Sequence, residues 1–218
     1  MANELHVMAD LETLGNDPKY GLIMALGAVV FDPYGDEIDC MKPLPMENTT
    51  GYSDELYLIM SVKDGLMHGF EINDDTFTWW QQPERKEEYM RMQRYEQAIG
   101  IEQMLIDFAA FVEFQPYVSV EHRYLWSHGA VFDAAHIFEK YKRFSRILEV
   151  RNPFQFRNIR DTRTIYKAHA DTFGQSVVWP DATMKHHPID DARRQAVAVQ
   201  RVMKRFRKVA NGYDWREA

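Results

Sequence analysis

The pattern of hydrophobic and polar residues predicts strands in the first part of the chain. Residues 22–31 form an almost wholly apolar run, which is typical of a strand buried on both faces. The short run Leu5–Val7 precedes it, and the alternating residues 37–41 follow it after a turn. These segments predict three consecutive strands joined by short links, which favours an antiparallel meander.

Helical spacing dominates the later part of the chain. Apolar residues recur at this spacing between 98 and 112, and predict an amphipathic helix that packs on the sheet. A fourth strand at 124–126 is followed by a helix over roughly 132–148. Asp161 is placed to cap a further helix, and a long final helix is predicted over 188–209, with a proline in its first turn.

The segment between these two groups has no clear pattern. Residues 43–73 show little periodicity, so we expect irregular structure with one short helix at most. Two short helices follow, one ending near Trp79–Trp80 and one beginning at Pro83. We therefore predict a single domain over residues 1–218, with a partly irregular and partly helical insertion at 43–118 between the third and fourth strands.

Composition limits the class of protein. A chain of 218 residues with 45% hydrophobic residues can bury one sizeable core. It contains neither an apolar run long enough to span a bilayer nor the pattern of a secretory signal, so we expect no membrane partner. The single cysteine, Cys40, excludes an internal disulfide and favours a reducing compartment, which predicts a cytoplasmic protein.

The net charge argues against a protein that binds nucleic acid over its whole surface. It is −7, from 26 basic and 33 acidic residues, whereas such binding depends on Lys and Arg neutralising phosphates. An enzyme that binds phosphate through a metal ion remains compatible with this charge. The final helix is an exception, since a basic face is predicted from Arg193, Arg194, Arg201, Lys204, Arg205, Arg207 and Lys208.

Two acidic residues stand close together at the predicted end of the first strand. Asp10 and Glu12 are two residues apart, so both side chains point to the same side of a strand. Carboxylates held this close repel each other unless a proton or a cation lies between them. Taken alone, an acidic and solvated strand end explains the pair slightly better than a functional site does.

Three further acidic residues lie at the starts of predicted helices. Asp133 is in a first turn, on the apolar side, where a helix cap and a cation-bound acid explain it equally well. Asp190 and Asp191 lie in the first turn of the final helix. At about 100° per residue, Asp191 borders the apolar stripe and Asp190 lies roughly opposite it. We therefore expect Asp191 to be functional and Asp190 to be a solvated charge.

Two histidines, His186 and His187, lie in the loop before the final helix. A surface position is the usual outcome for a loop histidine, but an imidazole beside carboxylates can also accept a proton near neutral pH. Carboxylates without cysteine favour Mg²⁺ or Mn²⁺ over zinc. Two such ions can hold a phosphodiester, activate a water and stabilise the leaving oxygen.

Three segments resemble, in order, the three motifs of the DEDDh (DnaQ-like) 3′–5′ exonucleases: Asp10–Thr13, Gly129–Asp133 and His186–Ala192. Together they extend over nearly the whole chain. Within this family, further segments look like the phage and prophage exonucleases of the exonuclease A (DexA) and exodeoxyribonuclease VIII-like type: Asp32-Pro33, Trp79-Trp80 and Arg160–Thr164.

The resemblance implies an RNase H-like α/β fold, with a mixed five-stranded sheet flanked by helices. It implies that Asp10, Glu12 and Asp191 hold one metal ion and that Asp10 also holds a second, both ions being Mg²⁺ or Mn²⁺. Asp133 would act largely through a water. His186 would be the general base, because the motif has four residues between its histidine and its last aspartate.

The resemblance also implies contacts with the substrate. Thr13 and Leu14 would meet the terminal nucleotide, and Phe132 could stack near a base. His128 stands where this subgroup commonly has Asn, and would be the substrate contact at that position. Trp80 is a further candidate, although adjacent tryptophans on a helix point about 100° apart and at least one is expected in the core.

The sequence therefore predicts a metal-dependent 3′–5′ exonuclease that hydrolyses phosphodiester bonds at nucleic-acid 3′ ends and releases nucleoside monophosphates, with DNA as the expected substrate. One alternative is an exoribonuclease, an oligonucleotide-trimming enzyme or an endonuclease on the same fold. Another is a non-catalytic phage factor that binds nucleic acid or protein. The motifs do not indicate an oligomeric state.

Overall fold

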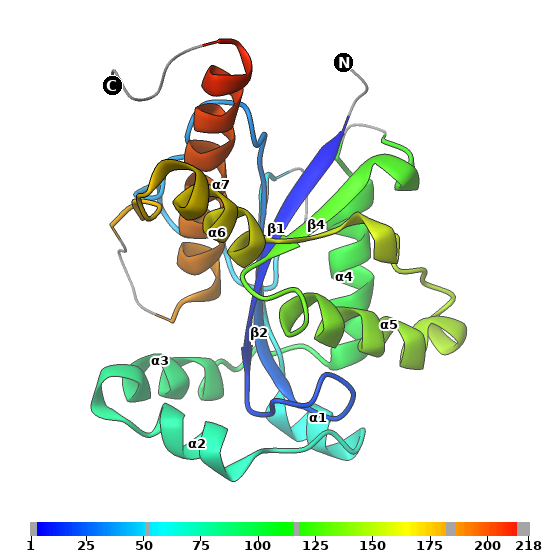
Figure 1. Cartoon of the computed structure of the whole chain (residues 1–218). Coiled ribbons are helices and arrows are strands. Elements are labelled where there is room, and N and C mark those ends of the chain that lie inside the picture. Colours follow the sequence, from blue (N-terminus) through cyan, green and yellow to red (C-terminus); the bar gives the residue numbers. More distant parts are fainter. Residues whose placement is uncertain (1–3, 51–52, 116–117, 182–185, 213–218) are drawn as a thin grey trace.

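The computed structural model of the chain describes residues 4–50, 53–115, 118–181 and 186–212. Within these residues, a mixed five-stranded sheet has the strand order β3-β2-β1-β4-β5 (Figure 1). β1 lies at its centre, antiparallel to β2 and parallel to β4. The strands are β1 (Leu5–Thr13), β2 (Ile23–Val30), β3 (Glu55–Ile59), β4 (Arg123–Ser127) and β5 (Ile159–Asp161). This arrangement confirms the predicted mixed sheet.

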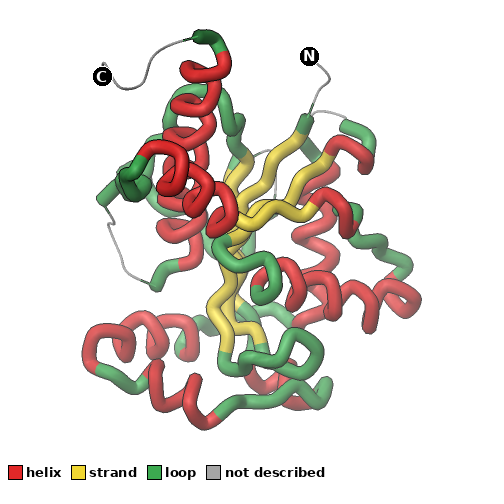
Figure 2. The backbone as a smooth tube through the Cα atoms, in the orientation of Figure 1, coloured by secondary structure: helices red, strands yellow, loops and turns green. Residues whose placement is uncertain are grey.

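Helices flank the sheet on both sides (Figure 2). The longest, α7, packs across β1 and β2, and α6 packs against α7, whereas α4 and α5 lie on the other side of the sheet (Figure 1). None of the described helices is long and apolar enough to cross a membrane. The helices are α1 (Val62–Met67), α2 (Asp74–Trp80), α3 (Pro83–Gln93), α4 (Ile101–Glu113), α5 (Asp133–Leu148), α6 (Thr162–Phe173) and α7 (Pro188–Ala210).

The third strand differs from the prediction. Residues 37–41 form no strand, because the amide of Ile38 donates to the Oε1 of the buried Gln200 on α7 (3.2 Å) and not to a neighbouring strand. β3 lies instead within the segment predicted to be irregular. All its residues are buried, so it lacks the alternation by which a half-exposed strand is found.

The insertion therefore begins after β3, and contains helices α1 to α4. Residues 51–52 and 116–117 of the predicted 43–118 segment lie outside the described part of the chain. The pair α2 and α3 lies beyond the ends of β1 and β2 (Figure 1). The insertion thus places helices next to the strand end that carries the acidic residues.

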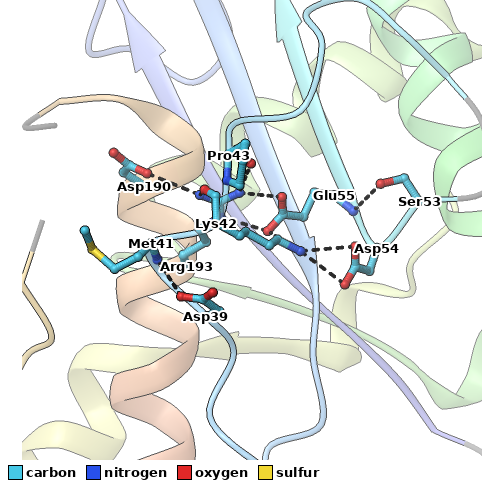
Figure 3. Close-up of polar contacts among 9 residues, drawn as sticks. All are labelled: Asp39, Met41, Lys42, Pro43, Ser53, Asp54, Glu55, Asp190 and Arg193. Atoms are coloured by element: carbon cyan, nitrogen blue, oxygen red, sulfur yellow. Dashed lines mark hydrogen bonds and ion pairs between the residues drawn. The ribbon is translucent and has the colours of Figure 1, made fainter. Parts of the chain in front are cut away.

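The final helix is less exposed than the prediction of a basic face requires. Arg193 is fully buried and forms an ion pair with Glu55 of β3 (Figure 3). Asp190, predicted as a solvated charge, is only 2% exposed and lies 3.6 Å from the Arg193 guanidinium. The prediction of a solvated charge is therefore wrong for Asp190, and the prediction of a basic surface residue is wrong for Arg193, whose buried partner Glu55 lies on β3. The other six residues of the predicted basic face are at least partly exposed.

Candidate active site

β1 continues beyond its parallel partner, and its acidic residues lie on this extension. The pairing of β1 with β4 ends at Met8 and Trp126, whereas its pairing with β2 continues to Thr13. Asp10 and Glu12 therefore lie in the last part of β1, at the strand end where they were predicted, and β1 extends further than the short run Leu5–Val7 indicated. Their side chains share one face, because they are two residues apart.

A glycine brings the start of α7 onto the same face. Gly27 is the cross-strand partner of Asp10, so positions 10 and 27 point to the same side of the sheet. A Cβ on Gly27 would lie 2.4 Å from the carbonyl carbon of Pro188, at the first residue of α7. Only glycine permits this approach, which carries Asp191 towards Asp10.

The result is a cluster of three carboxylates. One oxygen each from Asp10, Glu12 and Asp191 lie within 4.8 Å of one another. Burial, followed by the charges of neighbouring carboxylates, raises the pKa of Asp10 and of Glu12 well above the ordinary values. Burial also raises the pKa of Asp191, against the opposing effect of Arg194. Neutralisation by a cation would relieve this repulsion, and an all-carboxylate donor set fits Mg²⁺ or Mn²⁺.

Asp133 lies beside this cluster without joining the three oxygens. It is buried at the first residue of α5, and its Oδ1 accepts a hydrogen bond from the backbone amide of Leu11 (3.2 Å). Burial raises its pKa to about 7. The bond ties α5 to the strand segment between Asp10 and Glu12, so all four predicted acids converge on one region.

Two residues on α7 that the sequence did not single out as functional contact these acids. Gln195 Nε2 donates to Asp10 Oδ1 (2.7 Å), and Arg194 Nη1 donates to Asp191 Oδ1 (3.2 Å). They follow Asp191 by four and three positions. This is the spacing at which helix residues are neighbours, so it could have identified them.

The two histidines before α7 have different surroundings. His186 is half-buried, and its backbone adopts the left-handed conformation, with φ +59°. The centre of its ring lies 4.9 Å from that of Trp79 on α2. His187 is fully buried, 4.7 Å from the ring of Tyr57 on β3. Burial lowers the pKa of His187, and its ring nitrogens have no hydrogen-bond partner among the described residues.

A cavity of about 390 Å³ opens between β1 and α2. Its lining includes three residues predicted to contact substrate, namely Thr13, Trp80 and Phe132, together with Glu12 of the acidic cluster and the half-buried Trp79. The Trp80 ring is itself buried, and its Nε1 donates to the carbonyl of Thr13 (2.9 Å).

The other predicted substrate contacts lie away from this cavity. Leu14 is fully buried in the hydrophobic core. His128, at the end of β4, has its Nδ1 2.8 Å from Thr162 Oγ1, and its ring lies 5.4 Å from that of Trp179. The structure therefore gathers the acids on one face of β1, with the predicted substrate contacts divided between the α2 side and the α6 side.

Comparison with protein families gives an independent assignment. Residues 5–203 match a family described as the 3′-5′ exoribonuclease Rv2179c-like domain. No protein of curated function matches the chain by sequence.

Solved structures show a similar fold. E. coli exonuclease I in complex with a dT13 oligonucleotide aligns with a TM-score of 0.58 and 9% identity, over 96% of this chain and 43% of that chain. Exonuclease I from Methylocaldum szegediense aligns with a TM-score of 0.56 and 13% identity, over 95% and 41%. The zinc-bound E. coli exonuclease I–ssDNA complex gives 0.61 and 9%, over 95% and 42%. This chain thus spans less than half the length of exonuclease I, and at these identities the likeness shows the RNase H-like fold alone.

Proposed function

The chain belongs to the Rv2179c-like family of DnaQ-like 3′–5′ exonucleases, and from this we propose that it removes nucleoside monophosphates one at a time from the 3′ end of a nucleic-acid strand with the aid of two divalent metal ions. The observation that carries the proposal is the cluster of three carboxylate oxygens within 4.8 Å. Burying three like charges together is costly unless cations neutralise them.

The acidic residues would hold Mg²⁺ or Mn²⁺. Asp10, Glu12 and Asp191 would ligate one ion, with Asp10 shared between both, and Asp133 would act through a water. Bound there, the ions supply charge neutralisation at the scissile phosphate and at the leaving oxygen. Gln195 and Arg194 hold Asp10 and Asp191 by hydrogen bonds, which orients these ligands.

His186 would act as the general base, taking a proton from the attacking water. Imidazole is the side chain that exchanges protons most readily near neutral pH. Its ring packs edge-to-face against Trp79, which supports a positioned role. The complete burial of His187 supports His186 over His187 for this role.

The cavity beside α2 would receive the terminal nucleotide. Thr13 and Phe132 line it and lie next to Glu12. Its volume of about 390 Å³ lies within the range of roughly 300–1,000 Å³ typical of small-ligand sites.

Two further questions concern the substrate and the family: whether the strand is DNA or RNA, and which subgroup of the family the chain resembles most. The family description supports RNA, whereas the resemblance to the phage exonuclease A group and the exonuclease I complexes with DNA support a deoxyribose strand. The test therefore includes both DNA and RNA. A single strand is favoured in either case, because E. coli exonuclease I forms a complex with single-stranded DNA.

The test uses 5′-labelled single- and double-stranded DNA and RNA with Mg²⁺, with Mn²⁺ or with EDTA. Stepwise shortening that needs the metal and is lost in Asp10→Ala supports the proposal, and the preferred polymer identifies the sugar. Internal fragments would indicate an endonuclease. Absence of cleavage, together with absence of metal binding by calorimetry, would indicate a non-catalytic binding protein.

A further inference from the structure

The loop between α6 and α7 presents a tryptophan at the surface. Trp179 is 37% exposed, and both of its neighbours in the chain are tied to α7. Arg201 Nη1 donates to the carbonyl of Val178 (2.8 Å), and Arg194 Nε donates to the carbonyl of Pro180 (3.1 Å). Two arginines, two helical turns apart, therefore fix the backbone on either side of this ring.

The ring itself is also held in place. Its centroid lies 5.3 Å from that of Tyr166 and 5.4 Å from that of His128, with interplanar angles of 78° and 88°. Perpendicular aromatic contacts of this kind are favourable and directional. His128 is in turn 2.8 Å from Thr162 Oγ1 at the start of α6. Trp179 is thus a rigid, partly exposed aromatic surface.

One arginine connects this surface to the acidic cluster. The Arg194 guanidinium lies 5.8 Å from the centre of the Trp179 ring, and its Nη1 donates to Asp191 Oδ1 (3.2 Å). A second guanidinium, that of Arg163, lies close to Gly129, since a Cβ there would be 3.2 Å from Arg163 Cζ. Trp179 therefore combines an aromatic ring with the neighbouring guanidinium of Arg194, in a protein that is acidic overall.

We propose that Trp179 is a stacking subsite for an unpaired base of the substrate strand, with the guanidinium of Arg194 facing the backbone of that strand. Aromatic rings beside arginines are the combination by which proteins hold single strands without reading their sequence. The cavity assigned to the terminal nucleotide lies beside α2, whereas this loop lies beside α6 and α7 (Figure 1). The base on Trp179 is therefore that of a nucleotide upstream of the terminal one.

This inference rests on the proposed function only for the direction of the strand. A binding assay tests the stacking subsite without requiring hydrolysis. The probe is a 5′-fluorescent octanucleotide with phosphorothioate links, which resist hydrolysis, measured by anisotropy with Mg²⁺. Trp179→Ala should weaken binding about 5- to 140-fold, since one stacked base contributes this much. Trp179→Phe should bind nearly as tightly as the unmodified protein. Tyr34→Ala is the matched control, because Tyr34 is an exposed aromatic that contacts Arg207 near the other end of α7, and it should leave binding unchanged.

Hydrolysis separates a subsite from a merely structural role. The p-nitrophenyl ester of thymidine 5′-monophosphate contains one base, so Trp179→Ala should leave its turnover unchanged while kcat/KM on an octamer falls. Equal losses on both substrates, or unchanged binding of the octamer by Trp179→Ala, would overturn the proposal. Binding that depends on Trp179 without any cleavage would instead contradict the exonuclease function and leave the subsite standing.

Discussion

Glu55 of β3 and Arg193 of α7 form a buried ion pair with two hydrogen bonds. Arg193 Nε and Nη2 lie 2.8 and 2.7 Å from the two carboxylate oxygens, and the side chains are only 1% and 4% exposed (Figure 3). The remaining guanidinium hydrogens reach the carbonyls of Lys42 and Pro43 at 2.8 and 3.0 Å. Every charge is satisfied, so the pair joins the strand at the edge of the sheet to the helix that carries Asp191.

Removal of one partner should destabilise the protein strongly. Glu55→Gln leaves Arg193 with only Asp190 at 3.6 Å as a charged partner, and Arg193→Met leaves Glu55 with only the partly exposed Lys42 at 3.1 Å. Loss of the buried charge pair should cost about 3–5 kcal/mol. Urea unfolding measures this loss. The matched control is Glu37→Gln, which removes an exposed partner of Arg201 on the same helix, where the side chains are 40% and 32% exposed. That change should cost at most about 1 kcal/mol. Equal effects at the two sites would contradict the structural role of the buried pair.

The same pair explains which parts of the fold the sequence predicted. The α4, α5 and α7 helices have apolar residues at helical spacing, and α7 also has Pro188 in its first turn, so their positions followed from local patterns. β3 has no such local signal, because all five of its residues are buried. The error at Arg193 follows from missing β3, which carries its partner Glu55, and Asp190 is buried beside the same guanidinium.

The acidic residues and their grouping around a metal were expected from the motifs, whereas the packing contacts that bring them together were not. That Asp10 meets Asp191 depends on the contact between Gly27 and Pro188, two residues far apart in the sequence. Similarly, the ring contact between His186 and Trp79 depends on where the insertion packs, which no periodicity between residues 43 and 73 specified.

Substitution of Gly27 tests this contact. In Gly27→Ala the new Cβ would lie 2.4–2.6 Å from three backbone atoms of Pro188 and Ile189, so α7 must shift. We expect a loss of about 1–3 kcal/mol in the free energy of unfolding, as for other overpacked sites. We also expect weaker Mn²⁺ binding by calorimetry, because Asp191 moves away from Asp10. Ala28→Gly, at the next position of β2, should lower stability without changing the metal affinity. Unaltered Mn²⁺ affinity in Gly27→Ala would show that the glycine does not set the geometry of the cluster.

Metal binding should stabilise the protein more as the pH rises. The folded pKa of Asp133 is raised to about 7, and those of Asp10 and Glu12 lie well above their ordinary values, so the folded chain retains protons that the unfolded chain releases above about pH 4. These carboxylates therefore contribute less to stability as the pH rises towards 7 without metal. A cation that displaces the protons neutralises the carboxylates and so prevents this loss of stability.

Differential scanning calorimetry with EDTA or with excess Mg²⁺ measures the effect at pH 5 and pH 7.5. The shift in Tm caused by Mg²⁺ should be larger at pH 7.5. The comparison with EDTA at each pH is needed because burial lowers the pKa of His187, whose contribution has the opposite sign. Asp10→Asn should raise the Tm in EDTA and abolish the shift. A Mg²⁺ shift that is the same at both pH values would contradict the coupling between protons and metal.

Substitution of the two histidines should separate catalysis from stability. Asparagine is the appropriate replacement at position 186, because it tolerates the left-handed backbone that His186 adopts at φ +59°. His186→Asn should reduce kcat about 10²-fold or more while leaving the free energy of unfolding nearly unchanged, as expected for loss of a general base. His187→Asn removes a buried ring that contacts Tyr57, and should cost about 1–3 kcal/mol of stability while the folded protein keeps most of its kcat.

Kinetics on a labelled oligonucleotide and urea unfolding of both variants measure the two effects. Equal losses of kcat would place the general base elsewhere, since His187 is fully buried and His186 is only half-buried.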